Sequence, residues 1–193
     1  MGAAPGTRHH ISEEVNTSHR SVETVPEIAL EGAMKKFGAL LGFIALAQVI
    51  GGAPGFVTTK SIKDGWYDRL DKPKWTPPNS IFGPIWGVLF VLMAVAAWRV
   101  WLKREENREE TKTALTWWGV QLGLNAGWSL LFFGARKPKL ACLELLALWG
   151  SIVLTMRLLW RRDQMAGALF VPYLAWTSFA MAVSASIAWR NKE

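Results

Sequence analysis

Long apolar segments that are almost free of charged side chains recur along this chain, and they constrain its fold more than any other feature. Each is 17 to 25 residues long, and they are Phe37–Val57, Ile81–Trp98, Ala114–Ala135, Leu140–Met156 and Met165–Trp189. The chain has 22 basic and 15 acidic residues, yet only Glu144 falls inside these segments. An amphipathic helix of a soluble protein has a charged face, which these segments lack. Because about 20 apolar residues cross a hydrocarbon layer of about 30 Å, the pattern predicts an all-α membrane protein, a bundle of five transmembrane helices.

The first 33 residues differ in composition from the rest. They combine Ser, Thr, Pro and Gly with five glutamates and contain no apolar run near their start, which argues against a secretory signal or an Arg-rich transit peptide. We predict a polar, flexible, disordered N-terminal tail over residues 1–33, with a short helix near Pro26–Gly32, and a membrane domain over residues 34–193. The helices of this domain are expected at about 37–57, 81–102, 114–135, 140–160 and 165–189.

Cysteine, histidine and charge exclude several classes of site. A single cysteine, Cys142, excludes an internal disulfide scaffold and a Cys-rich metal site. The three histidines, His9, His10 and His19, all precede the apolar segments, so no predicted helix offers an imidazole for haem ligation. The net charge of +7 is spread over every loop, which favours contacts with phospholipid headgroups over nucleic acid. We therefore expect no metal site, no cofactor and no nucleic-acid partner.

The segment between the first two apolar stretches is unusual for a loop. The first stretch ends in the cluster Gly51–Gly55, which contains Pro54 and should break or kink the helix. The loop that follows, about Thr58–Ser80, combines prolines with the large apolar side chains of Trp66, Tyr67 and Trp75. Such a loop is expected to fold back over an apolar surface.

The third apolar segment has two different faces. At about 100° per residue, Gly119, Gly123 and Gly127 share one face. The opposite face carries polar and indole side chains, namely Trp118, Gln121, Asn125, Trp128 and Ser129. Amide side chains need partners in hydrocarbon, so this face should point into the bundle. The glycines suit close packing, either within the chain or along a dimer seam, and Asn125 suits either an interhelical contact or a ligand contact.

Two aromatic residues and one acid in the other segments also constrain the site. Trp86 lies deeper than an interfacial anchor needs to be, and Trp176 follows Pro172, which should kink the last helix. Glu144 lies near the start of its helix, where it can reach headgroups or Lys139, and an interfacial role is the preferred interpretation. No nucleophile with a nearby base, phosphate-binding loop or metal-ligand spacing is present, so no catalytic residue is predicted. An apolar pocket rich in indoles suits a flat, hydrophobic aromatic ligand.

Six motifs occur in order, one on or before each predicted helix. They are Gly65-Trp66-Tyr67, Lys72-Pro73-Lys74-Trp75-Thr76-Pro77-Pro78, Gly83-Pro84-Ile85-Trp86-Gly87, Gln121-Leu122-Gly123-Leu124-Asn125-Ala126-Gly127-Trp128, Phe132-Phe133-Gly134-Ala135-Arg136 and Pro172-Tyr173-Leu174-Ala175-Trp176. In these motifs the chain resembles the translocator protein / tryptophan-rich sensory protein family (TspO/MBR, also called the peripheral benzodiazepine receptor family). The resemblance covers about residues 37–190 and leaves out the tail.

This resemblance implies a five-helix bundle, commonly a homodimer, with a pocket open toward the first loop. It implies a membrane receptor or carrier for porphyrins and other tetrapyrroles of the protoporphyrin type, with a role in porphyrin homeostasis or stress response. Animal members bind cholesterol and benzodiazepine-type ligands. Carried over by motif, the ligand-binding residues are Trp66, Tyr67, Trp86, Asn125, Trp128 and Trp176. The membrane implied is the mitochondrial outer membrane for a eukaryotic chain and the bacterial membrane otherwise.

Two alternatives to a tetrapyrrole receptor stay open. The first is a light-dependent protoporphyrin-degrading enzyme, because breakdown in bacterial relatives has been attributed to indoles that match Trp86 and Trp176. The second is a membrane adaptor whose pocket holds only lipid and whose tail binds partners. Sterols are also flat hydrophobic ligands, but the animal cholesterol motif needs a tyrosine that the segment Val183–Arg190 lacks. This departure favours tetrapyrrole binding or stress sensing over sterol transport.

Overall fold

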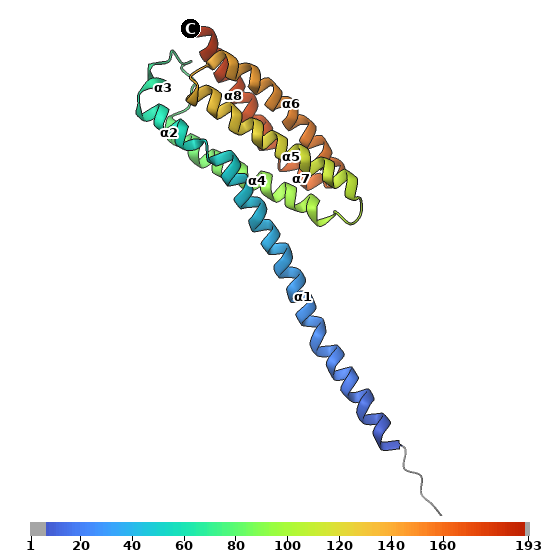
Figure 1. Ribbon diagram of the computed structural model, residues 1–193. Helices are drawn as coiled ribbons and strands as arrows, with labels where there is room; N and C mark the ends of the chain where they lie inside the picture. The colour runs from blue at the N-terminus through green and yellow to red at the C-terminus, as the bar shows by residue number, and fades with distance from the viewer. Residues whose placement is uncertain (1–6, 192–193) are drawn as a thin grey trace, which may run out of the picture. The chain divides into compact units, whose positions relative to one another are not determined.

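The computed structural model describes the backbone of residues 7–191 and the side chains of residues 27–191. This part of the chain consists of helices joined by turns and short loops, and it contains no strand. The α-helices are α1 (Thr7–Gly52), α2 (Gly55–Lys63), α3 (Trp66–Arg69), α4 (Asn79–Leu102), α5 (Arg108–Ser129), α6 (Pro138–Arg162), α7 (Gln164–Ala168) and α8 (Val171–Arg190) (Figure 1). One π-helical turn, η1 (Leu130–Gly134), follows α5 directly.

The chain divides into two compact units, residues 1–39 and 40–193. In the first unit the described residues belong to α1, where Glu31 and Lys35 form an exposed ion pair of 3.5 Å one turn apart. The second unit contains the rest of α1 and every other element. All contacts described below lie within this second unit.

The prediction of a disordered tail over residues 1–33 is wrong from Thr7 onward, where α1 begins and continues to Gly52. Residues 1–6 lie outside the described part of the chain. Starting a helix is costly, whereas adding a residue to an existing helix costs little. The apolar residues that follow the predicted tail form a helix, and this helix extends N-terminally into a segment whose composition does not favour one. The short helix expected near Pro26–Gly32 is part of this longer helix.

Four segments of the described chain are long and apolar enough to cross a membrane, and they are Glu27–Lys63, Asn79–Leu102, Pro138–Arg162 and Gln164–Arg190. They contain four of the five predicted apolar segments. The remaining one, residues 114–135, forms most of α5 and η1, but α5 also includes a charged first turn and the polar Gln121 and Asn125. The all-α, multi-pass membrane architecture is confirmed, and a fifth span stays a prediction.

The glycine cluster after the first apolar segment interrupts the helix as predicted. α1 ends at Gly52 and α2 begins at Gly55, with Pro54 between them. The following loop differs from the prediction in its first half, because α2 continues to Lys63 and α3 adds one further turn. Residues 71–78 form no helix, as the prolines of that stretch require.

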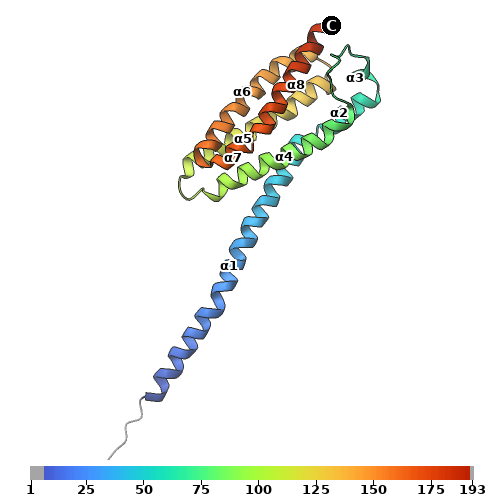
Figure 2. The same cartoon turned by 180° about the vertical axis from the view of Figure 1, so that it is seen from behind.

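The core of the bundle lies between α4, α5, α6 and α8. α6 packs against α5 and α8, and these three helices lie side by side in Figure 1 and in Figure 2. The largest fully buried side chains include Met93, Leu122, Leu148, Ile152 and Tyr173. The Trp118 indole N–H donates to the Met93 carbonyl (3.0 Å), which joins α5 to α4. The predicted inward orientation of the polar α5 face is confirmed, because Gln121 and Asn125 are buried.

α5 begins earlier than predicted because a polar residue caps its N-terminus. The Asn107 side chain accepts a hydrogen bond from the Glu110 backbone N–H (3.1 Å), and Glu109 and Glu110 lie in the first turn. Both features stabilise a helix start, the first by pairing a free N–H and the second by opposing the helix dipole.

Asp163 holds together the end of the bundle where α4 and α6 terminate, which we call the ion-pair end. Its carboxylate accepts two hydrogen bonds from Arg99 (3.1 and 3.0 Å), pairs with Lys103 (3.1 Å) and caps α7 through the Ala166 N–H (2.8 Å). Burial by itself would raise the pKa of this carboxyl. The hydrogen bonds from Arg99, Ala166 and Lys103 outweigh burial and lower the pKa to about 2.

Candidate functional site

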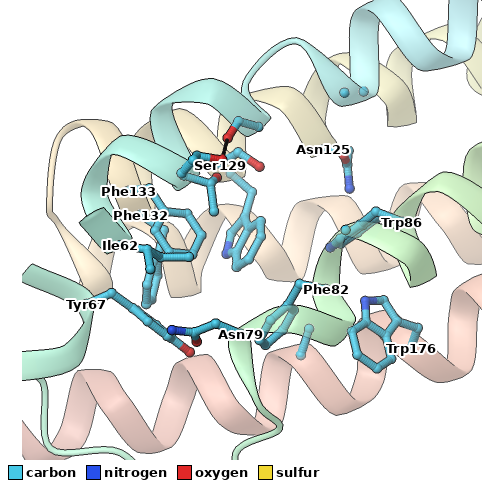
Figure 3. A pocket seen from close by; sticks show the side chains of 18 of the residues that line it. Ile62, Tyr67, Asn79, Phe82, Trp86, Asn125, Ser129, Phe132, Phe133 and Trp176 are labelled. Atoms are coloured by element: carbon cyan, nitrogen blue, oxygen red, sulfur yellow. Dashed lines mark hydrogen bonds between the residues drawn. The ribbon is translucent and has the colours of Figure 1, made fainter. Parts of the chain in front are cut away.

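A cavity of about 480 Å³ lies at the opposite end of the bundle. We call this the lid end, because Tyr67 of the segment 64–78 (the lid) forms part of the cavity wall. The α1–α2 junction, α2, α3, the first half of α4, the end of α5 with η1, and α8 form its wall (Figure 3). Its volume falls within the range of roughly 300–1,000 Å³ that is typical of small-molecule sites. None of the described residues that line it is Asp, Glu, Lys or Arg. The wall is therefore aromatic, aliphatic and neutral polar.

The structure brings together five of the six residues expected to bind the ligand. Tyr67, Trp86, Asn125, Trp128 and Trp176 all line the cavity. They come from α3, α4, α5 and α8, and Figure 3 labels four of them around one space.

Trp66, the sixth residue, does not line the cavity. Its ring packs edge-on against Phe132 at 5.9 Å, and the Arg136 guanidinium lies 5.7 Å from it. Successive residues of a helix point about 100° apart. On α3 this turns Tyr67 toward the cavity and Trp66 away from it. Of the two lid residues expected to contact the ligand, Tyr67 lines the cavity and Trp66 does not.

The indoles of Trp86 and Trp176 are held by neighbouring rings. Trp86 stacks on Phe90 (5.5 Å between centroids) and meets Tyr173 edge-on (6.1 Å). Trp176 packs against Phe82 (5.9 Å) and Phe179 (5.6 Å). Such aromatic pairs restrict the rings to one orientation and leave aromatic surface for a flat ligand.

Three buried N–H donors of the cavity wall have no hydrogen-bond partner among the described residues. They are Asn125 Nδ2, Trp128 Nε1 and Trp176 Nε1, and Asn125 is only 2 % exposed. Two other indoles of the bundle are paired, since Trp149 donates to Ser178 (2.8 Å) and Trp118 donates to the Met93 carbonyl. An unpaired buried donor is costly, and most such groups in folded proteins find a partner. Three such donors in one cavity wall indicate a place where a ligand with acceptor atoms can bind.

Tyr67 closes the cavity at the lid. Its ring packs against Phe133 (5.5 Å) and Phe132 (6.3 Å), and the Lys72 ammonium lies 4.3 Å from its centre while donating to the Tyr67 carbonyl (2.8 Å). Burial and, to a smaller extent, the charge of Asp68 raise the pKa of the Tyr67 phenol to about 12. The phenol therefore stays neutral at physiological pH and keeps its O–H as a donor.

The lid is tied to the bundle at two places. Asn191 accepts a hydrogen bond from the Asp71 N–H (3.0 Å) and donates to the Asp71 carbonyl (3.1 Å). Arg190 and Asp71 form an ion pair of 3.6 Å, and Arg136 and Asp64 form one of 3.5 Å. Residues far apart in sequence thus hold the cover over the cavity.

Several residues of the cavity wall were not predicted individually. The aromatic members of this set are Phe82, Phe90, Phe132, Phe133 and Phe179. Two sequence signals point to part of the set. Phe82 lies one helical turn before Trp86, and Phe132 and Phe133 belong to one of the six motifs. Gln48 is a further member, and the donation of its amide to the Gly87 carbonyl (3.3 Å) joins α1 to α4.

Other polar residues singled out in the sequence lie outside the cavity wall. Both carboxylate oxygens of Glu144 are buried without a hydrogen-bond partner in the described part of the chain, so the contact with Lys139, one of the two expected alternatives, is not formed.

The three glycines of the third apolar segment also lie outside the cavity wall. Gly119 and Gly123 face open space, and a Cβ on Gly127 would lie 3.8 Å from Glu144 Oε1. Among residues 27–191 no group of three or more His, Cys, Asp and Glu side chains could hold a metal ion.

Comparison with known proteins agrees with this arrangement. The sequence profile of the TspO/MBR family matches residues 43–190, which include the whole cavity wall. The chain belongs to the TspO/MBR family. It is 37% identical over 152 residues to the tryptophan-rich protein TspO of Chlorobaculum tepidum, covering 77% of this chain and 92% of that protein. It is 40% identical over 125 residues to protein CrtK of Rhodobacter capsulatus (65% and 77%) and 34% identical over 126 residues to the human translocator protein (65% and 74%).

Family membership and the four apolar helices together identify this TspO/MBR chain as a multi-pass integral membrane protein. The resemblance read from the six motifs is confirmed. The matched region begins at residue 43, so most of α1 lies outside the part shared with the family.

Proposed function

We propose that this protein is a membrane receptor or carrier that binds flat, hydrophobic ligands of the tetrapyrrole class, such as protoporphyrin, in the cavity at the lid end. The names of its relatives, translocator protein and tryptophan-rich sensory protein, support a receptor or carrier role. The observation that carries the proposal is the combination of fixed indole rings with three unpaired N–H donors in a wall without charged groups. A macrocycle with aromatic faces and acceptor atoms satisfies both.

Two structural expectations belong to the same proposal. The first is that α5 and η1 form a fifth span, because together they are as long as the span Gln164–Arg190 and no charged residue lies between Lys112 and Arg136. The second is a homodimer whose seam includes Gly119 and Gly123, which have no neighbouring atom within 4 Å where a Cβ would stand. In lipid, small residues on an open helix face allow another helix to approach closely.

Titration of purified protein with protoporphyrin IX tests the proposed ligand. Protoporphyrin quenches tryptophan fluorescence when it binds near an indole. We expect Trp86→Ala and Trp176→Ala each to raise the dissociation constant about tenfold, because each removes a ring face, and an aromatic contact of this kind contributes about 1.5 kcal/mol.

Trp189→Ala is the matched control, since this tryptophan is 88 % exposed and does not line the cavity. Its titration should match that of the wild type. Unchanged dissociation constants in both cavity variants, or a wild-type protein that does not bind protoporphyrin, would refute the proposal. A parallel titration with cholesterol measures the preference for tetrapyrroles over sterols.

A further inference from the structure

The cavity reaches the molecular surface on one side only within the described residues. The lining residues that are exposed are Gly52, Gly55, Thr59, Asn79, Ser80 and Gly83. They all belong to the end of α1, to α2 and to the start of α4. Every lining residue from α3, α5, η1 and α8 is buried or half-buried. The cavity therefore opens between α2 and α4, and we call this gap the lateral opening.

Glycines determine where α1 and α2 separate from α4. At Gly51 the helices touch, because a Cβ there would overlap the Phe90 ring. Toward the lid end, Cβ atoms on Gly55, Gly83 and Gly87 would meet no neighbouring atom within 4 Å. The helices thus separate where Gly55, Gly83 and Gly87 have no side chain to fill the space between them.

The surroundings of the lateral opening are those of a surface in contact with lipid. Both of its flanks belong to candidate membrane spans, Glu27–Lys63 and Asn79–Leu102. Apolar side chains beside it are exposed, with Phe56 at 71 % and Val88 at 60 %. Such exposure is expected where helices contact hydrocarbon.

Behind the opening lies the unpaired donor already described. Asn125 is almost completely buried, lines the cavity, and leaves its Nδ2 without a partner (Figure 3). The opening therefore leads from lipid to a group that needs an acceptor. A route over the lid would instead require breaking the two Asn191–Asp71 hydrogen bonds and separating Trp75 from Phe179.

We propose that the ligand reaches the cavity sideways from the bilayer, through the lateral opening whose width Gly55 and Gly83 determine. The proposal rests on the proposed function and adds that the ligand is an amphiphile already dissolved in the membrane. Its polar edge passes Thr59, Asn79 and Ser80, while its apolar body stays in contact with hydrocarbon and then with the rings of the wall.

Stopped-flow fluorescence tests this route. The protein is reconstituted in vesicles, and protoporphyrin IX is added at increasing mole fractions relative to lipid. We expect Gly55→Leu and Gly83→Leu each to lower the association rate constant at least fivefold, because the leucine side chain narrows the opening. Gly42→Leu is the matched control, since a Cβ at Gly42 on α1 also meets no neighbour but Gly42 does not line the cavity.

A second measurement avoids any folding defect caused by leucine. In a Cys142→Ser background, Thr59→Cys is labelled after purification with a bulky maleimide, and Gly42→Cys is labelled in the same way for comparison. The label at position 59 should slow association at least fivefold, and the label at position 42 should not. Asn191→Ala, which loosens the lid, should leave the association rate unchanged.

The outcomes separate this proposal from the proposed function. Association rates that stay the same in the leucine variants and in the labelled Thr59→Cys protein, or that rise in Asn191→Ala, overturn the lateral route. Wild-type vesicles that bind no protoporphyrin overturn the proposed function itself.

Discussion

The buried carboxylate at one end of the bundle and the buried donors of the cavity wall at the other end differ in how they are paired. At the ion-pair end, the buried Asp163 carboxylate is saturated by Arg99, Lys103 and the Ala166 N–H. At the lid end, Asn125, Trp128 and Trp176 keep buried donors without a partner. Because an unpaired buried donor costs about 1–3 kcal/mol, the first arrangement stabilises the fold and the second destabilises it.

The packing of small residues follows the same division. Gly167 near the ion-pair end is in such close contact with Trp160 that an added Cβ would lie 2.5 Å from the indole ring. Gly55, Gly83 and Gly87 at the lid end have empty space where a Cβ would stand. Glycine therefore packs closely at Gly167 and at Gly51, and it leaves open space at Gly55, Gly83 and Gly87. Substitutions at the two ends should separate stability from ligand affinity.

The largest expected effect is the loss of stability on replacing Asp163 by alanine. The variant leaves Arg99 and Lys103 without their common partner and removes the cap of α7. We expect the free energy of unfolding to fall by about 2–3 kcal/mol, measured by thermal unfolding in detergent. The dissociation constant for protoporphyrin should stay within twofold of the wild type, and a tenfold change would contradict the separation of the two ends.

The pH dependence of the wild type checks the same carboxylate. Its pKa is about 2 in the folded protein and 3.8 in the reference state, so the stabilisation is present above about pH 4 and is lost as the pH falls toward 2. The loss amounts to about 2 kcal/mol for a shift of this size. The Asp163→Ala variant should lack this pH-dependent part of the stability. If the stability of both proteins fell identically between pH 4 and pH 2, the assignment to Asp163 would be wrong.

The contrast between the ends also shows what the sequence allows one to predict. Apolar segments and helical periodicity are local, and they identified four candidate spans, the break at Gly51–Gly55 and the buried position of Asn125. The partners of Asp163 lie 60 and 64 residues away in the chain, and the partner of Asp71 lies 120 residues away. Such pairs depend on how helices come together, which no local pattern contains.

The length of α1 and the position of Trp66 were mispredicted for related reasons. Composition favours a flexible tail, but an adjoining helix extends into it. Trp66 and Tyr67 are adjacent aromatic residues, and only the orientation of α3 decides which one lines the cavity. The sequence shows that two rings are present in the lid and does not show where each points.

The substitution Asn125→Leu is expected to have an effect of intermediate size, and it tests the comparison between the two ends from the side of the cavity. Leucine has a similar volume and no donor, so the variant removes an unsatisfied buried group. We expect stability to stay equal or to rise by about 1 kcal/mol, while affinity for protoporphyrin falls about tenfold because a hydrogen bond to the ligand is lost. Thermal unfolding and fluorescence titration on the same samples measure the two quantities.

Gln121→Leu is the matched control one turn earlier on α5. The Gln121 amide already donates to the Trp118 carbonyl (2.9 Å), and this residue does not line the cavity. The Gln121→Leu variant should therefore lose about 1 kcal/mol of stability and keep its affinity for protoporphyrin. If both variants changed stability and affinity in the same way, the unpaired donor of Asn125 would have no special role.

The smallest expected effect concerns the contact that holds the lid. Asn191→Ala removes both hydrogen bonds to the Asp71 backbone, which are exposed and therefore contribute about 0.5–1 kcal/mol together. Amide hydrogen exchange over residues 64–78 should accelerate about two- to fivefold, while exchange at the ion-pair end stays unchanged. The Tyr67 ring contacts with Phe132 and Phe133 remain in this variant, so the lid loosens without leaving the cavity. Exchange that is unchanged in the lid would mean that the remaining ring contacts and ion pairs are enough to hold it. Exchange that accelerates throughout the bundle would mean that the two ends do not open independently.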